Sequence, residues 1–142
     1  MLKLTNLNQF YGQSHTLWDI SLEVQKGECL CVMGRNGVGK TTLMDTIMGQ
    51  HRIESGTIEF DGEDITKLSV EDRASLGIGY VPQGRQIFPL LTVEENLKIG
   101  IGARRDGLKA VPKAIYDMFP VLYDMRHRQG GDLSGGQQQQ LA

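Results

Sequence analysis

The sequence predicts an α/β protein in which a parallel core carries an antiparallel β subdomain and a helical subdomain. Three observations support this fold class. An apolar run leads into a glycine-rich loop and an amphipathic helix, alternating strands precede that run, and helical patterns dominate the last third of the chain. We therefore expect two regions: residues 1–85, with the core and the β subdomain, and residues 86–142, with the helical subdomain.

The first strands are predicted by the spacing of apolar residues. Leu2–Leu7 and Leu17–Val24 alternate apolar with polar residues, which is typical of half-exposed strands, and Lys26-Gly27 is expected to form a turn. The next segment, Glu28–Met33, ends in an uninterrupted apolar run. Such a run predicts a strand that is buried on both faces of a parallel sheet.

The residues after this strand, Gly34–Thr42, read GRNGVGKTT and match the phosphate-loop pattern G-x-x-x-x-G-K-[ST]. Glycines let several backbone N–H groups approach a triphosphate, and the positive end of the following helix dipole adds to the attraction. Lys40 is expected to reach the β- and γ-phosphates, and the Thr41 hydroxyl to bind Mg²⁺. The alternative is a glycine turn that binds nothing, but the flanking elements favour nucleotide binding.

Local signals predict the elements that follow the loop. A helix with one apolar side covers Leu43–Met48 and stops at Gly49. Asp61-Gly62 predicts a hairpin turn between Thr57–Phe60 and Glu63–Ile65.

A capped helix and a second core strand come next. Ser69 with Asp72 predicts a short helix, through Leu76, that Gly77 ends. Ile78–Val81 predicts a core strand, so that Gln83 would lie just past its carboxyl end, where ligand-facing groups gather in α/β sheets. An ordinary turn residue is the alternative for Gln83.

The helical region begins with an apolar cluster, Phe88–Val93, beside a loop. Thr92 and Glu95 predict a capping box for a helix to about Ile99, with Glu94 and Glu95 as its charged first turn. Pro112 suits a first helical position. The apolar residues after it follow helical spacing, which continues across Pro120: Ile115, Met118, Phe119 and Leu122.

The last motif is Leu133-Ser134-Gly135-Gly136-Gln137. Ser134 can cap a helix that has Gln137 at its third position, which would make Gln137–Gln140 a polar helix face. Capping does not explain two glycines in the first turn, since each costs about 1 kcal/mol relative to alanine. Their small size would leave the first-turn N–H groups open to an anion.

Tyr11 lies between the two predicted amino-terminal strands and has two interpretations. Its ring could stack on the flat face of a purine, a contact worth about 1–3 kcal/mol by analogy with base stacking. The local sequence favours the simpler alternative, a tyrosine that covers the edge of a strand.

Composition excludes several classes of protein. The 142 residues are 39% hydrophobic and 23% charged, with a net charge of −2, so there is no strong basic field for nucleic acid. The apolar runs are too short for a membrane span, and the segment from Met1 to Asn6 lacks the apolar core of a signal peptide. We expect a cytosolic protein that does not bind nucleic acid.

The two cysteines, Cys29 and Cys31, would share one face of the predicted buried strand. Two ligands cannot close a zinc site, and the histidines at 15, 51 and 127 are scattered along the chain. We therefore expect both thiols to pack in the core.

In this order, GRNGVGKTT, Gln83 and LSGGQ resemble the ATP-binding subunit of ABC transporters, which has a P-loop NTPase core. The resemblance covers essentially the whole chain. It implies ATP and Mg²⁺ as cofactors, Tyr11 as the aromatic that stacks on adenine, Lys40 and Gln83 as catalytic residues, and Thr41 and Gln83 as metal ligands. The implied ATP-binding residues are Tyr11, Gly34, Arg35, Asn36, Gly37, Val38, Gly39, Lys40, Thr41 and Thr42, and the signature residues that contact ATP on a partner subunit are Ser134, Gly135, Gly136 and Gln137.

A finer resemblance is to the branched-chain amino-acid and urea importer group, and within it to the urea-importer ATPase. It rests on the segments YGQSHTLWDISLEV, MGRNGVGKTT, YVPQGRQIFPLLTVEENL and GGDLSGGQQQQLA. This implies an ATPase that drives uptake of urea or, alternatively, of branched-chain amino acids. The implied partners are a second ATPase subunit in a head-to-tail dimer, integral membrane permease subunits reached through Phe88–Val93, and indirectly a periplasmic solute-binding protein. The implied location is the cytoplasmic face of the inner membrane.

In the family, a Walker B strand with a catalytic glutamate, a D-loop and a switch histidine follow the LSGGQ helix, whereas this chain stops at Ala142. We therefore expect a C-terminally truncated fragment, partial in both regions, which cannot hydrolyse ATP alone and is prone to aggregate. Two further hypotheses stay open: a soluble ABC protein without a membrane partner, and a nucleotide-binding module without turnover.

Overall fold

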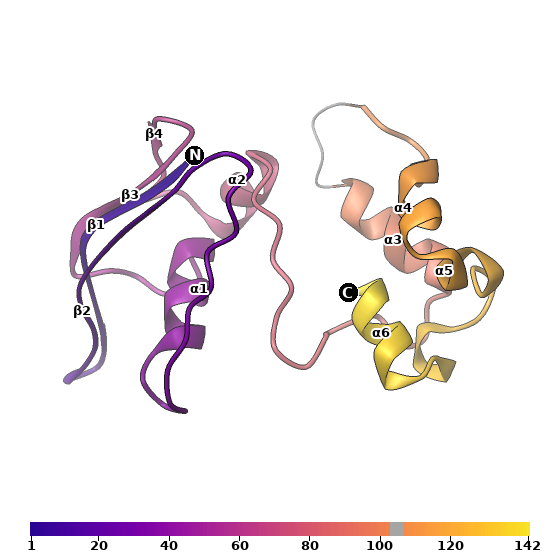
Figure 1. Ribbon diagram of the computed structural model, residues 1–142, viewed down its shortest axis with the longest axis horizontal. Helices are drawn as coiled ribbons and strands as arrows, with labels where there is room; N and C mark the ends of the chain where they lie inside the picture. Colours follow the sequence, from indigo (N-terminus) through magenta and orange to yellow (C-terminus); the bar gives the residue numbers. More distant parts are fainter. Residues whose placement is uncertain (103–106) are drawn as a thin grey trace. The chain divides into compact units, whose positions relative to one another are not determined.

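The computed structural model describes residues 1–102 and 107–142, which divide into two compact units, Met1–Ile78 and Gly79–Ala142 (Figure 1). Each unit has its own buried hydrophobic cluster. Residues 79–85, which the sequence assigns to the first region, belong to the second unit. The division of the complete protein into domains stays a prediction.

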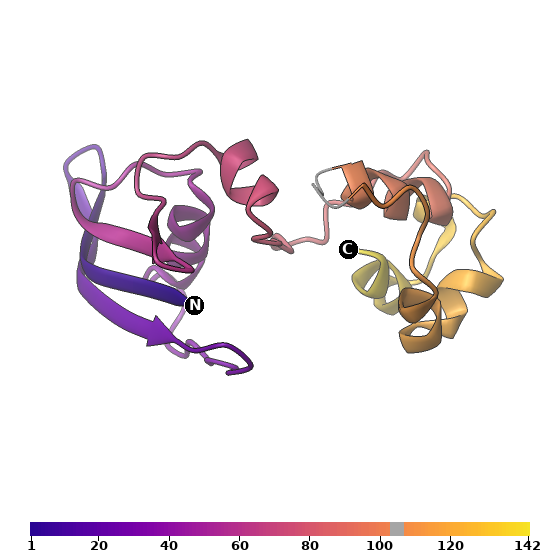
Figure 2. The ribbon, with the colours of Figure 1, turned by 90° about the horizontal axis from the view of Figure 1, so that it is seen from above.

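The first unit contains an antiparallel sheet of four strands, as the alternating patterns predict. β1 (Leu2–Tyr11) pairs with β2 (Ser14–Val24) on one side and with β3 (Ser55–Phe60) on the other, and β4 (Glu63–Asp64) pairs with β3. The order β2-β1-β3-β4 therefore places β1 inside the sheet (Figure 2). The predicted strands at 2–7 and 17–24 are confirmed, and both extend further toward the turn that joins them.

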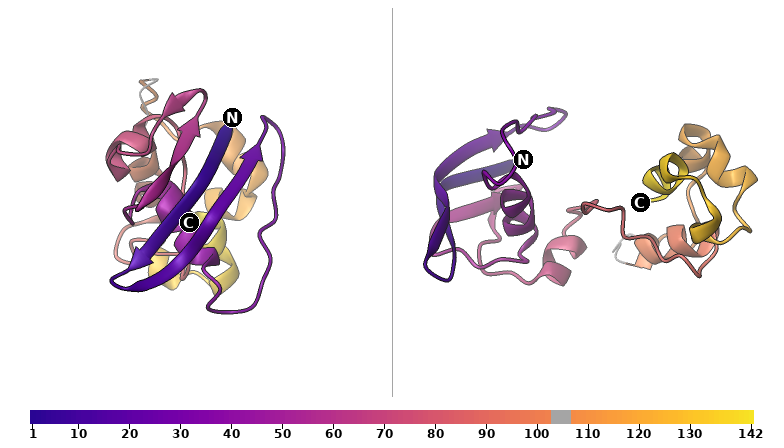
Figure 3. Two further views of the ribbon diagram at one scale, coloured as in Figure 1. Left: turned by 90° about the vertical axis from the view of Figure 1, so that its left-hand side faces the viewer. Right: turned by 90° about the horizontal axis from the view of Figure 1, so that it is seen from below.

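Helix α1 (Lys40–Met48) covers one face of this sheet (Figure 3). Its Leu43 joins apolar side chains from the strands in one core, and each fully buried leucine or isoleucine there contributes about 1.5–3 kcal/mol. The helix ends at Gly49, which has φ 85°, as predicted. The buried core residues are Leu4, Leu7, Leu17, Leu43, Ile58 and Ile65.

The predicted hairpin and short helix are both present. Asp61 and Gly62 have φ of 51° and 83°, the two positive values that a tight type I′ turn requires. Helix α2 (Val70–Ser75) begins after Ser69, whose hydroxyl accepts the Asp72 N–H at 3.2 Å. Both local signals were therefore sufficient without tertiary information.

Arg73 of α2 is a buried side chain whose partners are backbone carbonyl groups. Its guanidinium donates to Thr46 and Ile47 in the last turn of α1, at 2.9 and 2.7 Å, and also to Thr66 and Leu68. A cation is stabilising at the carboxyl end of a helix. Burial lowers the pKa of Arg73, but an arginine remains protonated. Arg73 thus connects α2 to the carboxyl end of α1.

The two predicted core strands are not regular strands. Glu28–Met33 is irregular and open to solvent, with Leu30 48% and Met33 84% exposed, and Ile78–Val81 is irregular as well. A strand needs a neighbour for its ladder hydrogen bonds, and neither segment pairs with a strand among residues 1–102 and 107–142. The prediction of buried parallel strands is therefore wrong for both segments.

The exposure of Glu28–Met33 also changes the environment of the two cysteines in that segment. Cys29 and Cys31 are free thiols and both are exposed. Core packing was predicted from the expectation of a buried strand, and that prediction fails together with the strand.

The second unit is helical. Its elements are α3 (Val93–Gly102), α4 (Lys113–Met118), α5 (Pro120–Asp124), the 3₁₀ turn η1 (Gly130–Asp132) and α6 (Gly135–Leu141). They bury a second cluster, to which α6 contributes from the end of the chain (Figure 1). The buried members of this cluster are Val93, Leu122, Leu133 and Leu141.

The capping box of α3 is confirmed. A carboxylate oxygen of Glu95 accepts the N–H and the hydroxyl of Thr92, both at 2.8 Å, and Thr92 accepts the Glu95 N–H at 3.2 Å. These bonds lower the pKa of the Glu95 carboxyl. The helix includes Gly100 and continues to Gly102, so the prediction that these glycines end it near Ile99 is wrong. The further break expected at 104–107 lies mostly outside the described residues.

The pattern across Pro120 divides into two helices. Pro112 precedes α4 as its cap instead of being its first residue, and Phe119 leaves helical geometry with φ −128° and ψ 72°. Pro120 then begins α5, because proline suits a first helical position but lacks the N–H that a helix interior needs.

Candidate phosphate-binding site

Lys40, the lysine of the glycine-rich loop, folds back over that loop. Its ammonium group donates to the carbonyl oxygens of Gly34 and Arg35, each at 2.7 Å. An ammonium group has three donors, so it can hold the loop in shape and still bind a phosphate oxygen. The predicted roles of Gly34–Thr42 are compatible with this geometry.

Gly39, the residue that caps α1, has a backbone that other residues adopt poorly. Its φ is 97°, and a Cβ there would lie 3.1 Å from Leu17 Cδ2 and 3.3 Å from the Thr16 carbonyl oxygen. Glycine therefore lets the loop pass close to β2. No side chain accepts a hydrogen bond at this cap. The amino end of α1 thus offers N–H groups and a positive dipole end to an anion.

Thr41, the predicted magnesium ligand, is exposed in the first turn of α1. Among residues 1–102 and 107–142, no group of three His, Cys, Asp or Glu side chains could hold a metal ion. Mg²⁺ bound with a nucleotide needs only one or two protein groups, because phosphates and water supply its other ligands. The Thr41 hydroxyl, beside the glycine-rich loop, fits a magnesium site that protein and nucleotide share. The metal roles of Thr41 and Gln83 stay predictions.

The hydroxyl of Tyr11 has a specific partner. It lies 2.8 Å from Nε2 of His51, and the two rings meet edge to face with centroids 4.9 Å apart. Tyr11 is 47% exposed, so the ring can still be approached. Sequence reasoning missed His51, because 40 positions separate the two residues and no motif connects them. The stacking role of Tyr11 stays a prediction.

Gln83 lies in an exposed turn of the second unit, whereas Lys40 and Thr41 belong to the first unit. The strand that was expected to place Gln83 is irregular, so its position depends on the turn at Gln83-Gly84. Its predicted contacts with metal and water stay predictions.

Ser134 and Gln137 cap α6 as predicted. The Ser134 hydroxyl accepts the Gln137 N–H at 3.4 Å, and the Gln137 side-chain oxygen accepts the Ser134 N–H at 2.9 Å. The two glycines between them differ: a Cβ on Gly136 would meet open space, but one on Gly135 would lie 3.1 Å from Arg85 Nη1. Sequence reasoning missed Arg85.

The apolar cluster predicted at Phe88–Val93 is only partly exposed to solvent. Phe88 and Leu90 are 51% and 80% exposed, whereas Val93 is fully buried in the core of the second unit. The candidate contact surface is therefore centred on Phe88 and Leu90, and the inclusion of Val93 was wrong.

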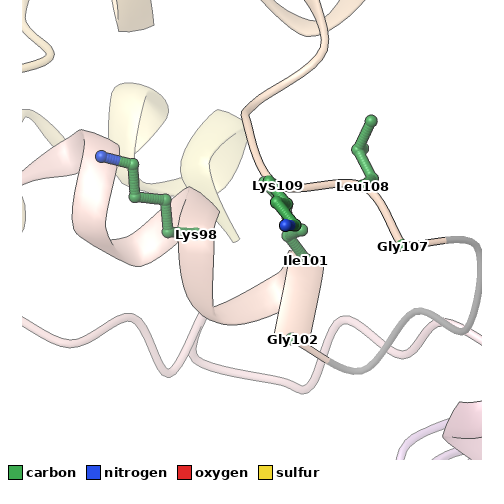
Figure 4. A pocket seen from close by; sticks show the side chains of 6 residues that line it. All are labelled: Lys98, Ile101, Gly102, Gly107, Leu108 and Lys109. Carbon is green, nitrogen blue, oxygen red and sulfur yellow. The ribbon is translucent and has the colours of Figure 1, made fainter.

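A hollow of about 460 Å³ lies beside the end of α3 (Figure 4). Ligand sites combine apolar walls with a few converging polar groups. Here the ammonium group of Lys98 pairs with Glu94 at 2.8 Å and points away from Lys109 (Figure 4). The hollow contains none of the predicted site residues. It is lined by Lys98, Ile101, Gly102, Gly107, Leu108 and Lys109.

In the parts of the chain that the structure describes, 1–102 and 107–142, the helices are too short or too polar to cross a membrane.

The glycine loop, its lysine and the open helix end are the parts of a P-loop nucleotide-binding protein. A family model described as "ABC transporter" matches residues 17–142. The chain belongs to the ABC transporter family.

Two relatives among transport ATP-binding proteins match the whole chain. The high-affinity branched-chain amino acid transport ATP-binding protein BraG of Pseudomonas aeruginosa is 37% identical over 143 residues. The probable branched-chain amino acid transport ATP-binding protein LivF of Archaeoglobus fulgidus is 40% identical over 143 residues. The chain covers 61% of the length of each relative.

The fold is similar to that of a solved cassette. The dimeric, post-hydrolysis structure of the ATP-binding cassette MJ0796, bound to ADP and Pi, matches with a TM-score of 0.84 at 26% identity. The match covers 99% of this chain and 66% of that one. The predicted fold class, an ABC ATPase, is confirmed at this level.

Proposed function

We propose that this chain supplies the nucleotide-binding part of an ATPase subunit of an ABC importer. The observation that carries the proposal is the Lys40 ammonium group held at 2.7 Å from the Gly34 and Arg35 carbonyls, at the uncapped end of α1. A point charge beside free backbone donors supports the binding of a triphosphate at this helix end. Membership of the ABC transporter family supports ATP as the nucleotide.

Each predicted residue has a role in this proposal. Gly34–Thr42 bind the phosphates, Lys40 stabilises charge on the γ-phosphate, and Tyr11 stacks on adenine with its hydroxyl held by His51. Thr41 and Gln83 would hold Mg²⁺, which when bound neutralises phosphate charge. Gln83 would also orient the attacking water.

The signature residues act on a second subunit in this proposal. Two ATPase subunits close head to tail, and Ser134–Gln137 of each subunit cover the ATP held by the other. The dimeric cassette with a similar fold supports this arrangement. Hydrolysis is then phosphoryl transfer to water, driven mainly by positioning and by electrostatic stabilisation.

The subunit would work at the cytoplasmic face of the inner membrane with permease subunits. Phe88 and Leu90 are exposed apolar side chains in the loop that follows Gln83, so a permease contact there would move the loop that carries Gln83. A periplasmic solute-binding protein would act indirectly, through the permease.

Urea is the solute that the sequence resemblance favours. Branched-chain amino acids are the second candidate, because BraG and LivF carry that description and match the whole chain. Nothing in a phosphate site selects the solute, which other subunits bind.

The nucleotide proposal is tested by magnesium-dependent ATP binding and turnover of the full-length protein with its membrane subunits. We expect binding, and turnover that Lys40→Ala abolishes and Lys26→Ala, at an exposed lysine, leaves intact. Binding without turnover would instead support a nucleotide-binding module, and no binding at all would refute the proposal.

The solute is tested by uptake in cells that lack the chromosomal copy of the gene. Restored uptake of labelled urea, but not of labelled leucine, would support the urea importer. The reverse result would support the branched-chain amino-acid importer. Restoration of neither would favour an ABC protein with another role.

A further inference from the structure

We propose that Arg85 is a positioning residue that ties the loop after Gln83 to the signature helix α6. The inference rests on the proposed function, because its consequence is the rate of ATP turnover. All of the contacts that carry it lie within the second unit.

The first observation is the contact between Arg85 and α6. Its Nη1 donates to the side-chain oxygen of Gln138 at 2.9 Å, and the guanidinium lies against the backbone of Gly135. A Cβ on Gly135 would lie 3.1 Å from Nη1 and 3.3 Å from Nη2, tighter than an ordinary van der Waals contact. Glycine at this position therefore makes room for the arginine, in addition to any role toward phosphate.

The second observation is that the same glutamine continues the network. Gln138 Nε2 donates to the Gly130 carbonyl at 3.4 Å, and the Gly130 N–H donates to the Leu91 carbonyl at 2.8 Å. The Gly131 N–H also donates to the Pro89 carbonyl at 2.9 Å. The loop is thus fastened at its beginning by Arg85 and at its end by Gly130 and Gly131. Between them, Asn96 of α3 exchanges hydrogen bonds with the Phe88 backbone, at 2.8 and 3.0 Å, while the side chains of Phe88 and Leu90 stay exposed.

The third observation is the backbone of the loop. Gly84, Arg85 and Gln86 all have positive φ, 84°, 71° and 51°, and the Gln86 N–H closes a tight turn on the Gly84 carbonyl at 2.8 Å. Positive φ is uncommon for residues other than glycine, and it persists where surrounding contacts impose it. The guanidinium contacts with Gln138 and Gly135 are such contacts.

A cation at the amino end of α6 is electrostatically unfavourable, because the helix dipole is positive there. Stability of α6 alone therefore does not account for Arg85. Coupling between the loop and α6 does account for Arg85. In this proposal a partner that displaces Phe88 or Leu90 also displaces Arg85, and Arg85 in turn displaces the helix that begins after Ser134.

The test is a double-mutant cycle in the full-length protein with its partner subunits. We expect Arg85→Ala and Gln138→Ala each to lower kcat about tenfold with KM for ATP within about twofold, because the P-loop is untouched. The double variant should be no slower than either single variant, since both remove one link. Gln139→Ala, at an exposed neighbour on α6, should behave as wild type.

Arg85→Gly separates positioning from folding. It removes the guanidinium but suits a φ of 71°, so its melting temperature should equal or exceed that of wild type while its kcat falls as in Arg85→Ala. Amide hydrogen exchange should rise in residues 84–91 in both the Arg85→Ala and the Gln138→Ala variants, with or without nucleotide.

Additive losses in the double variant, a change confined to KM, or an equal loss in Gln139→Ala would each overturn the positioning role. An inactive wild type would instead refute the proposed function and remove the basis of this inference with it. An active wild type with additive losses refutes the inference alone.

Discussion

Two glycine-rich helix ends in this chain are built in opposite ways. α1 begins at Lys40, after Gly39, which provides no side-chain cap. Its stabilising contacts lie at the far end, where Arg73 donates to the carbonyls of Thr46 and Ile47. α6 is fastened at its beginning, by the reciprocal bonds of Ser134 and Gln137.

The difference shows what each end is free to do. No side-chain acceptor at the cap competes with an anion for the first-turn N–H groups of α1, so an anion can accept hydrogen bonds from them at little cost. In α6 one of these donors is already used by Ser134. α1 is held at the end away from its proposed phosphate site, whereas α6 is held at its amino end, by its cap and by Arg85 beside Gly135.

The largest effect is expected when the far end of α1 is released. Arg73→Met removes the hydrogen bonds that the guanidinium donates to the carbonyls of Thr46, Ile47, Thr66 and Leu68, and only Thr46 also accepts the Gly49 N–H. Loss of a donor to a buried or half-buried carbonyl costs about 1–3 kcal/mol, so the free energy of unfolding should fall by about 3–5 kcal/mol. Denaturant titration measures it, with the exposed Arg52→Met as the matched control. A loss below about 1 kcal/mol would mean that Arg73 does not anchor α1.

The open end of α1 is tested next, through Lys40. Lys40→Ala removes a charge-assisted contact worth about 1.5–3 kcal/mol, so the Kd for Mg-ATP should rise about 10- to 100-fold. Calorimetry on the full-length protein measures it. Lys26→Ala serves as the control, and an unchanged affinity in Lys40→Ala would show that the lysine binds only the loop carbonyls.

Local signals in the sequence predicted most of these features. Ser69, Thr92 and Ser134 were found as caps, and Asp61-Gly62 as a turn, because each depends on residues within about four positions of one another. Gly34–Thr42 could be singled out as a candidate phosphate loop for the same reason, because its residues are consecutive, and its binding role stays a prediction.

Features that depend on distant partners were missed or misjudged. Glu28–Met33 has the composition of a core strand, but a strand also needs a paired neighbour, which no local pattern supplies. The Tyr11–His51 and Arg85–Gln138 contacts span 40 and 53 positions. No local pattern singles out Arg73, because its carbonyl partners in α1 lie 26 and 27 positions away.

Alanine at one glycine of each helix sharpens the contrast. Gly39→Ala forces a Cβ toward Leu17 at a φ of 97°, so it should cost about 1–2 kcal/mol and weaken Mg-ATP binding. Gly136→Ala meets open space and replaces a poor helix former, so it should stabilise the fold by up to about 1 kcal/mol. Melting curves of the two variants measure these effects. Equal shifts would contradict the contrast.

The smallest expected effect is the pH dependence that distinguishes the capping box of α3 from the capping box of α6. In α3 the reciprocal partner is the carboxylate of Glu95, and its bonds to Thr92 hold the pKa of that carboxyl below its ordinary value. The resulting stabilisation is fully present above about pH 4.3 and is lost as the pH falls through the lower folded pKa. The advantage of wild type over Glu95→Gln should therefore shrink in acid.

The neutral cap of α6 provides the control for this pH dependence. Gln137 also closes a reciprocal cap, but it accepts only the Ser134 N–H, whereas Glu95 accepts both the N–H and the hydroxyl of Thr92. Because Gln137 does not titrate, the cost of Gln137→Ala should be the same at pH 7 and at pH 3.5. Unfolding at both pH values, compared as differences between each variant and wild type, cancels the titration of Glu94 and Asp64, whose pKa values are also lowered. A wild-type advantage over Glu95→Gln that stays constant with pH would show that the Thr92 bonds do not depend on the charge of Glu95.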